Sequence, residues 1–468
     1  MTPAGAFAAR AAGGVALDAS VGIWRLPDRR AVERLRRAGL IRLAEAERRL
    51  LPLASPAFSD PLVDREWWLQ AVDALDVDPP GPGRPVSIVD SGLIADHPEF
   101  AGRPNVTVMN EQPGSTMDAD HGTEVASVVG APTNGVGIVG VYPQAVLRMW
   151  DASPDERITN GDAIAGIADA AASGPGVISL SWGSRNPDPL LRRAVLGAVR
   201  AGSLVVAASG NERQLGAPAI YPASFPHVLT VGATDESGRI AGFSSASPGM
   251  DVVAPGVDIP VADPTSSTGY SLADGTSFSA PIVAGAAAWI WTKQPTLTAA
   301  QVAALLEATA HDLGPPGWDR DTGAGLIDVA AALAAPMPPA DPSEPNDDIA
   351  YVRPSGFFTA AVPPLTPGTT LTASLDGVDD PRDVYRVAVP AGRTLRAVVG
   401  AADGAPLAVS LWRTGTRSVA ETGAVRRRDL LRAGAGAVTA RGVTYVAVGG
   451  SSTRRTSYTL TLATVARR

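Results

Sequence analysis

The sequence predicts an α/β protein built on a doubly wound parallel sheet, with a small α+β module before it and an all-β sandwich after it. Between residues 59 and 335, continuous apolar runs that end in Gly, Asp or Ser alternate with alanine-rich helical runs. This alternation is typical of parallel strands covered by helices on both faces. After residue 346 the helical runs cease, and segments that alternate apolar with polar residues indicate antiparallel strands.

Composition excludes several classes of protein. Hydrophobic residues make up 45% and charged residues 18% of the 468 residues, an ordinary balance for a globular chain of several domains. A net charge of −8 without long basic runs argues against a nucleic-acid partner. Cysteine is absent, so disulfides and thiolate metal sites are excluded. No apolar run reaches the ~18 residues of a membrane helix, and no signal peptide is visible in this chain.

The residue pattern of the N-terminal module predicts a strand, a helix and a further element. Residues 21–26 form a short strand, Asp28 caps a helix that Gly39 ends, and residues 40–51 return as a strand or second helix. The predicted boundaries along the chain are 1–58 for this module, 59–335 for the main domain, 336–346 for a proline-rich linker and 347–468 for the sandwich.

Three short polar segments lie at predicted junctions of the main domain. Asp90 follows the strand at 86–89, His121 opens a helical run, and Ser277 begins a long apolar helix with Pro281 in or near its first turn. Each alone is most often a turn or capping residue. Together they supply a hydroxyl nucleophile, a base that accepts its proton, and a carboxylate that orients the base. We therefore predict a catalytic triad at the carboxyl edge of the sheet.

A fourth polar residue fits the same chemistry. Asn211 follows the strand at 204–206, and its side-chain amide could donate a hydrogen bond to a developing oxyanion. The start of the helix at Ser277 also favours negative charge, because the backbone N–H groups there are unpaired.

From about residue 60 to residue 335 the chain resembles the subtilisin-like serine peptidases. The motifs that carry the resemblance are IVDSGLIADHPEF, DHGTEVASVVGAPTNGVGIVGV, VISLSWG, VVAASGNE, YPASFPHVLTVGAT, FSSASPGMDVVAPG, GTSFSAPIVAGAAA and GAGLIDVAAAL. The resemblance implies a triad of Asp90, His121 and Ser277, with Asn211 and the Ser277 N–H in the oxyanion hole. The chain departs from the family pattern at Glu124, where a second histidine is common, and at Phe278, where many members carry methionine.

The resemblance also implies a place for the substrate. Its backbone is expected to pair with Ser181-Trp182-Gly183 as an extra strand. Trp182 either belongs to the core or narrows a pocket for an apolar side chain. Ile220 stands where the family often has a small glycine at the floor of the primary pocket. A branched side chain there predicts a preference for small to medium apolar residues before the cut.

Calcium is the one cofactor that the resemblance implies, and no organic cofactor is expected. Thermitase-like relatives bind Ca²⁺ at positions matching Asp60, Glu99 and Asn134, with the backbone carbonyls of Pro132, Val136 and Ile138. Glu99 is longer than the usual aspartate. The alternative is a set of ordinary turn residues without a metal.

Both flanking modules resemble known companions of these peptidases. Residues 1–58 resemble a short propeptide with a cleavage boundary between Leu51 and Asp60, the alternative being a stabilising extension. The C-terminal module resembles the pre-peptidase C-terminal sandwich, through SEPNDD, DVYRVAVPAG and SYTLTL. The carboxylates that either bind another cation there or are solvated turn residues are Asp347, Asp348, Asp379 and Asp380.

These observations predict a secreted, extracellular serine endopeptidase that acts as a monomer on protein or peptide substrates. Its own N-terminal segment is a further expected partner, whereas nucleic acid and membranes are not. The alternative is a scaffold of the same fold, in which residues 15–58 block the cleft and the sandwich binds a surface or polymer.

Overall fold

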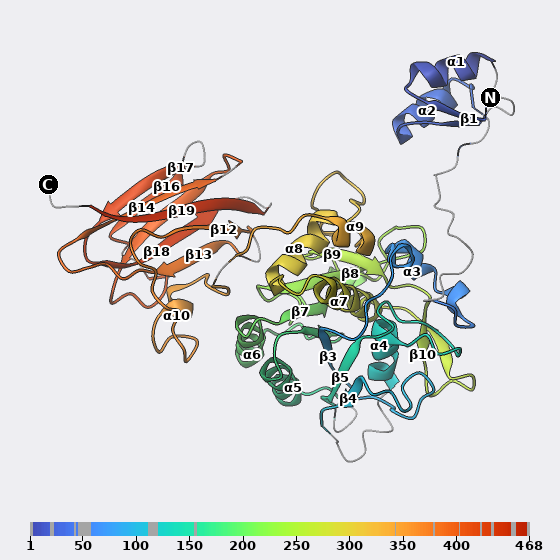
Figure 1. Cartoon of the computed structure of the whole chain (residues 1–468), viewed down its shortest axis with the longest axis horizontal. Helices are drawn as coiled ribbons and strands as arrows, with labels where there is room; N and C mark the ends of the chain where they lie inside the picture. The colour runs from blue at the N-terminus through green and yellow to red at the C-terminus, as the bar shows by residue number, and fades with distance from the viewer. Residues whose placement is uncertain are drawn as a thin grey trace. The chain divides into compact units, whose positions relative to one another are not determined.

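A computed structural model divides the chain into two compact units, Met1–Leu53 and Ala54–Arg468 (Figure 1). It describes residues 3–18, 23–41, 44, 58–110, 120–153, 157–341, 343–377, 380–401, 403–421, 424–431, 435–450 and 455–465. The element expected at 40–51 and the expected cleavage boundary lie largely outside the described residues, as does Asp379.

The first unit contains two helices and a small antiparallel sheet. Its elements are α1 (Pro3–Ala11), β1 (Val15–Asp18), β2 (Ile23–Arg25) and α2 (Arg29–Arg37). The predicted cap is present, since Asp28 Oδ1 accepts the N–H of Ala31 at 2.7 Å at the start of α2. This hydrogen bond satisfies one of the N–H groups that the first turn of a helix leaves unpaired.

The second unit contains a seven-stranded parallel sheet in the order β4-β5-β3-β6-β7-β8-β9. Its strands are β3 (Pro85–Asp90), β4 (Val106–Val108), β5 (Val146–Asp151), β6 (Val177–Leu180), β7 (Leu204–Ala208), β8 (Val228–Thr234) and β9 (Val252–Pro255). From β3 the chain passes to β4 at one edge, returns through β5 beside β3, and then crosses to β6 on the other side. The direction of winding therefore reverses beside β3, where open α/β sheets bind their ligands.

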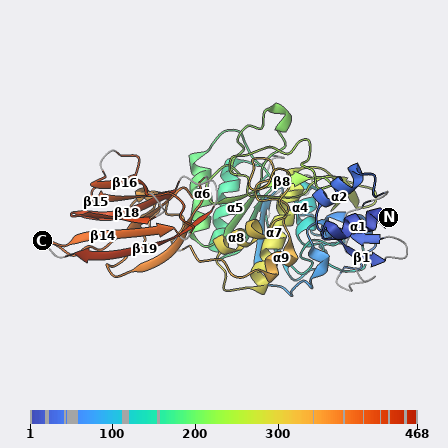
Figure 2. The same cartoon turned by 90° about the horizontal axis from the view of Figure 1, so that it is seen from above.

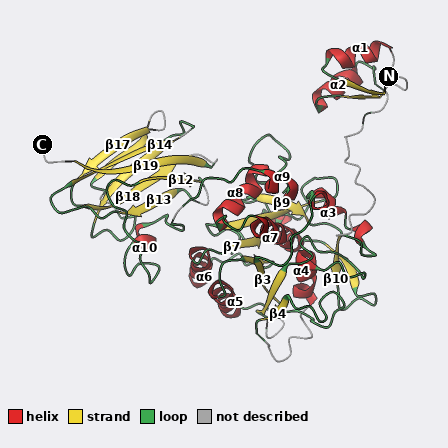
Figure 3. Cartoon of the chain, viewed as in Figure 1, coloured by secondary structure: helices red, strands yellow, loops and turns green. Residues whose placement is uncertain are grey.

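Helices cover both faces of this sheet, as Figure 3 shows. Adjacent residues of β3 face opposite layers, because Ile88 packs with α4 and α7 whereas Val89 packs with α5 and α6. The helices of this part are α3 (Trp67–Ala71), α4 (Asp120–Gly130), α5 (Asn160–Ala172), α6 (Pro189–Arg200), α7 (Thr276–Lys293), α8 (Ala299–Thr309) and α9 (Val329–Ala334). The short helix α10 (Ile349–Val352) packs instead with Val384 and Trp412 of the C-terminal part. A hairpin of β10 (Ile259–Ala262) and β11 (Tyr270–Ala273) lies outside the large sheet.

The C-terminal part of the second unit is a sandwich of two four-stranded antiparallel sheets, drawn orange to red in Figure 2. One sheet has the order β12-β19-β14-β17 and the other β13-β18-β15-β16. The strands are β12 (Thr370–Leu375), β13 (Arg382–Arg386), β14 (Thr394–Ala401), β15 (Leu407–Arg413), β16 (Arg426–Leu431), β17 (Ala435–Ala440), β18 (Val443–Gly450) and β19 (Thr456–Val465). Together with the parallel sheet, this architecture confirms the predicted fold class.

Within the described parts of the chain, no helix is both long enough and apolar enough to span a lipid bilayer.

Leucine-to-alanine substitutions in two settings test the core. Leu147 on β5 is fully buried, whereas Leu190 on α6 is 66% exposed. We expect Leu147→Ala to lower the free energy of unfolding by about 3–4 kcal/mol, since it leaves a cavity between sheet and helices. Leu190→Ala should change it by less than about 0.5 kcal/mol. Urea unfolding of both variants in a Ser277→Ala background measures this, and equal losses would contradict the layer assignment.

Candidate active site

Asp90 ends β3 at the point where the sheet reverses its winding. Its side chain is fully buried, and Oδ1 accepts the backbone N–H of Ser91 at 2.8 Å. Oδ1 also receives a hydrogen bond from Nδ1 of His121 at 2.8 Å. A buried carboxylate is tolerated when donors of this kind stabilise its charge.

His121 lies in the first turn of α4, which approaches the end of β3 closely. Gly122 permits this approach, because a Cβ there would lie 2.1 Å from the carbonyl oxygen of Gly92. The Gly122 N–H donates to Ser91 Oγ at 2.9 Å, a second bond between the helix and the strand end. These contacts hold the imidazole against Asp90, although His121 lies 31 residues further along the chain.

Ser277 is the second residue of α7 and is paired reciprocally with Ser181, which follows β6. Its Oγ donates to the Ser181 carbonyl at 3.1 Å, and Ser181 Oγ donates to the Ser277 carbonyl at 2.8 Å. Pro281 lies inside α7 rather than in its first turn. Because proline has no N–H, the carbonyl of Ser277 has no helical partner four residues on. The Ser181 hydroxyl takes that place.

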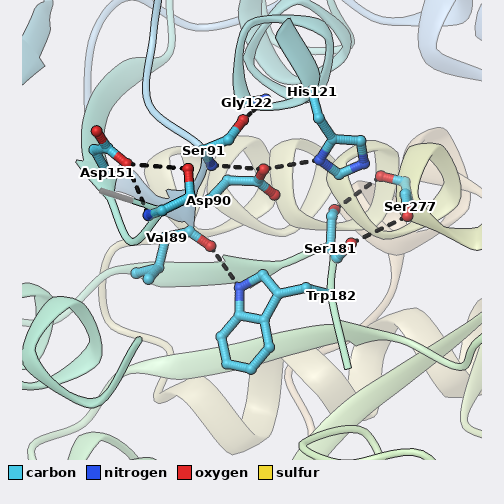
Figure 4. A network of polar contacts seen from close by, with 10 residues as sticks. Val89, Asp90, Ser91, His121, Gly122, Asp151, Ser181, Trp182 and Ser277 are labelled. Carbon is cyan, nitrogen blue, oxygen red and sulfur yellow. Dashed lines mark hydrogen bonds and ion pairs between the residues drawn. The ribbon is translucent and has the colours of Figure 1, made fainter. Parts of the chain in front are cut away.

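Figure 4 shows the His121 ring between the Asp90 carboxylate and the Ser277 side chain. The structure thus brings together the three residues predicted to act as a triad. Ser277 directs its single proton to Ser181 rather than to the imidazole in this arrangement. Hydrogen bonds between catalytic groups are often long or misaligned before substrate binds.

Asn211 is held beside Ser277 by the residue that precedes the serine. The Asn211 Oδ1 accepts both the N–H and the hydroxyl of Thr276, each at 3.0 Å. This pairing fixes the orientation of the amide, so Nδ2 is the group that can donate outward. Asn211 is exposed whereas Thr276 is buried, which places the donor where a substrate can reach it.

Charges around His121 favour its protonated form. Burial lowers the pKa of His121, but the charge and hydrogen bond of Asp90, together with Glu124, raise it to about 9. Burial raises the pKa of Glu124 to about 7, with His121 opposing and Asp263, Asp120 and Asp90 adding to the effect. The ring of Phe278 packs on the imidazole with centroids 5.9 Å apart.

Ile220 fills the space between Gly183, in the segment expected to pair with substrate, and Gly210, which precedes Asn211. It is buried, and a Cβ added to Gly183 would lie 2.3 Å from its Cγ2. A Cβ on Gly210, next to Asn211, would lie 2.7 Å from its Cγ1. Tyr221 and Ser184 exchange two backbone hydrogen bonds of 2.8 Å, which fasten the segment that carries Ile220 to the segment that carries Gly183. The Ile220 side chain therefore takes up volume between these glycines.

Trp182 is anchored beneath the same segment. Its Nε1 donates to the carbonyl of Val89 at 2.7 Å, and the ring packs on the core layer formed with α5 and α6. The side chain is half-buried. Trp182 thus joins the core, as one of the two alternatives for this residue expected.

The residues predicted to bind calcium lie together but are occupied by hydrogen-bond donors. Asp60 accepts the N–H groups of Gly135 at 2.7 Å and Asn134 at 3.0 Å, one on each oxygen. Asn134 Oδ1 accepts the N–H of Val136 at 2.9 Å. A cation would have to approach the same oxygens that these positively polarised hydrogens already face.

Glu99 shows the same arrangement in the interior. Its Oε1 accepts the N–H of Ile138 at 3.0 Å and the hydroxyl of Tyr270 at 2.8 Å. Burial raises the pKa of Glu99 to about 7, and it raises that of the neighbouring Glu66 well above its usual value. These residues do not fit a calcium ion in this arrangement, because N–H and O–H donors rather than a metal satisfy the carboxylates.

Two residues of the site were not predicted from sequence. Thr276 orients Asn211, and its position directly before Ser277 is the signal that could have identified it. Glu124 was noted only as a departure from the family pattern, although its charge acts on His121 across one turn of α4.

Known proteins resemble the part of the chain that carries this site. The family model Peptidase S8, described as the subtilase family, matches residues 81–325. Subtilisin BL of Lederbergia lenta is 37% identical over 254 residues, which are 54% of this chain and 91% of that protein.

Solved structures also resemble the chain. The psychrophilic subtilisin-like protease Apa1 from Pseudoalteromonas sp. AS-11 matches 57% of this chain and 97% of its own, with a TM-score of 0.52 and 20% identity. Fervidolysin from Fervidobacterium pennivorans, described as a keratinolytic enzyme related to subtilisin, matches 86% of this chain and 56% of its own. Its TM-score is 0.54 and its identity 25%.

Removing the charge of Glu124 tests the electrostatics around the imidazole. Glu124 is ionised above its pKa of about 7 and so stabilises the imidazolium near pH 9. Glu124→Gln should therefore lower the pKa of His121 by about 0.5–1 unit. A ¹H–¹⁵N NMR titration of the imidazole in a Ser277→Ala background measures the change. The exposed Glu236→Gln is the matched control, and an equal shift in both variants would contradict the local effect.

Proposed function

Because the chain belongs to the subtilase family of serine endopeptidases, we propose that it hydrolyses peptide bonds with Ser277 as nucleophile. The observation that carries the assignment of roles is the 2.8 Å hydrogen bond between Asp90 and His121 Nδ1, with the imidazole facing Ser277. Asp90 fixes the tautomer of His121, so that Nε2 is free to accept the serine proton.

Substrate binding would complete this arrangement. The Ser277 hydroxyl now donates to the Ser181 carbonyl. A substrate strand that pairs with residues 181–183 would offer its own N–H to that carbonyl. The hydroxyl would then lose its partner and turn toward His121 Nε2 by rotation about its side-chain bond. In this proposal, the bound peptide itself releases the nucleophile.

The reaction then proceeds by acyl transfer. Ser277 Oγ attacks the peptide carbonyl carbon while His121 takes the proton. The oxyanion receives hydrogen bonds from Asn211 Nδ2 and the Ser277 N–H at the positive end of α7. His121 next donates its proton to the leaving amine, and water hydrolyses the acyl-enzyme through the same groups. Because the base must be neutral, activity should rise as the pH passes through the raised pKa of His121.

We also propose that the enzyme acts outside the cell and matures by cleavage after its N-terminal module. The resemblance of residues 1–58 to a propeptide supports this proposal, as does the resemblance of the sandwich to modules that accompany secreted peptidases. No calcium-dependent step is included, since the residues at Asp60, Glu99 and Asn134 are held by N–H donors.

Labelling with a fluorophosphonate tests the nucleophile. The chain should become labelled after removal of residues 1–58, and Ser277→Ala should abolish labelling and lower peptide hydrolysis by at least ~10³-fold. Ser237→Ala, at an exposed turn, should behave like the parent chain. Absence of labelling in the processed parent would favour the scaffold alternative. Labelling that persists in Ser277→Ala would refute the assignment of the nucleophile.

Replacing Ile220 tests the pocket. Ile220→Gly opens space between Gly183 and Gly210, so kcat/KM for peptides with Phe before the cut should rise about tenfold relative to peptides with Val. The ratio of the two substrates in one preparation cancels any loss of folded enzyme. A parent enzyme that already prefers Phe strongly, or an unchanged ratio in the variant, would show that Ile220 does not limit the pocket.

A further inference from the structure

Two carboxylates and an imidazole converge where the first segment of the peptidase domain meets its last helix. Asp73 follows α3, His311 follows α8, and Asp328 directly precedes α9. One side-chain atom from each, a carboxylate oxygen or an imidazole nitrogen, lies within 4.8 Å of those of the other two. None of the three residues belongs to the triad or to the residues expected to bind calcium.

The imidazole of His311 faces both carboxylates at once. Its Nε2 lies 3.4 Å from Asp73 Oδ2, where it makes a hydrogen bond, and 3.1 Å from Asp328 Oδ2. A ring nitrogen carries at most one proton, so it can direct that proton at only one of the two oxygens. Both contacts are also long, because charge-assisted hydrogen bonds of this kind usually measure about 2.7–2.9 Å.

The same separations fit the edges of a metal tetrahedron. Zn²⁺ binds imidazole nitrogen and carboxylate oxygen at about 2.0–2.2 Å, so two ligand atoms of one tetrahedral ion lie about 3.3–3.5 Å apart. The separations of 3.1 and 3.4 Å between His311 Nε2 and the two oxygens are close to this value. An ion among the three atoms would take the place of the single proton and satisfy the nitrogen and both oxygens together.

Backbone hydrogen bonds hold the three segments that carry these side chains. The N–H of Val329 donates to the carbonyl of Val72 at 2.9 Å, which joins the residue after Asp328 to the residue before Asp73. His311 is fixed by two backbone hydrogen bonds of 2.7 and 2.9 Å to the segment that precedes Asp328. The ligand atoms are therefore brought together by the fold itself, and an ion that binds them has little chain to reorder.

The direction and exposure of the side chains suit an ion that comes from solution. Asp328 Oδ1 accepts the N–H of Ala331 at 2.7 Å as the cap of α9, and Oδ2 faces His311. The side chain of Asp328 is 9% exposed, that of Asp73 21% and that of His311 57%. The carboxylates thus lie deeper than the imidazole. The open side gives an ion access and leaves room for water as a fourth ligand.

We propose that Asp73, His311 and Asp328 bind one Zn²⁺ ion, and that this ion fastens the first segment of the peptidase domain to α9. The imidazole nitrogen decides the class of metal, because Zn²⁺ accepts nitrogen and oxygen ligands together, whereas Ca²⁺ and Mg²⁺ prefer oxygen alone. The two carboxylates supply the charge that balances a divalent cation. Three protein ligands and one water complete four-coordination.

Zinc titration of the full chain carrying Ser277→Ala tests the site independently of peptidase activity. After metal is removed with EDTA and the chelator is washed out, Zn²⁺ should shift the Nε2 resonance of His311 in a ¹H–¹⁵N spectrum of the imidazoles. The chain has four histidines, so the loss of one signal in His311→Asn identifies the resonance. Ca²⁺ and Mg²⁺ at the same concentration should leave it unchanged.

Variants of the ligands locate the ion. Asp328→Asn removes one charge but keeps the cap of α9, because asparagine caps helices as well as aspartate does. It should move the midpoint of the His311 shift to about tenfold higher Zn²⁺ or more. Asp64→Asn removes an exposed charge from the same first segment and should keep the midpoint of the parent. After dialysis against Zn²⁺, His311→Asn should hold one ion fewer per chain than the parent.

Melting curves test the fastening. With Zn²⁺ at about 100 times its dissociation constant, the melting temperature of the parent should rise by about 3 °C, and that of His311→Asn should not. An unshifted His311 resonance, equal midpoints in Asp328→Asn and Asp64→Asn, or an undiminished zinc content in His311→Asn would overturn the site and leave a metal-free ion pair. A shifted resonance with an unchanged melting temperature would overturn the fastening.

Discussion

The buried negative charge of Asp90 is the constraint on which the active site depends. A carboxylate with no exposed surface needs strong donors, and it finds them in the Ser91 N–H and in His121. Both donors lie at the end of β3, where the direction of winding in the sheet reverses. The need to satisfy the charge of Asp90 therefore also fixes the position of the imidazole. The close approach of α4 at Gly122 is the packing consequence. The electrostatic consequence is that the charge of Asp90 raises the pKa of His121.

A second constraint acts at the start of α7. Pro281 removes an N–H from the helix, and the carbonyl of Ser277 is thereby left to the hydroxyl of Ser181. The same two residues exchange a second bond through the serine Oγ. The helix that carries the proposed nucleophile is thus tied to the segment expected to bind substrate. A peptide that paired with this segment, as proposed, would compete for the Ser181 carbonyl that accepts the Ser277 hydroxyl.

Two groups of acidic residues in the protein show how local donors decide which carboxylate oxygens are satisfied. Around Asp60 and Glu99, a turn directs its N–H groups at the oxygens and supplies the compensating positive charge. Around Asp383, the donors reach one side of the carboxylates and leave the facing oxygens unpaired. The numbers of acidic residues are similar, but the direction of the backbone differs. The second arrangement leaves several buried carboxylate oxygens without a hydrogen-bond donor among the described residues.

The sequence alone determined the fold class and the identity of the central chemical groups. Alternating apolar strands and helices depend on local periodicity, and Asp90, His121 and Ser277 stand in motifs long enough to be recognised. Tertiary structure decided what depends on neighbours distant in the chain. It showed Thr276 holding Asn211, Ile220 filling the space between two glycines, and N–H donors directed at Asp60. It also brought the carboxylates of Asp341 and Asp383 together from two separate segments of the chain. Sequence spacing reports which groups a chain carries, whereas hydrogen-bond direction and enclosed volume arise only when separate segments pack together.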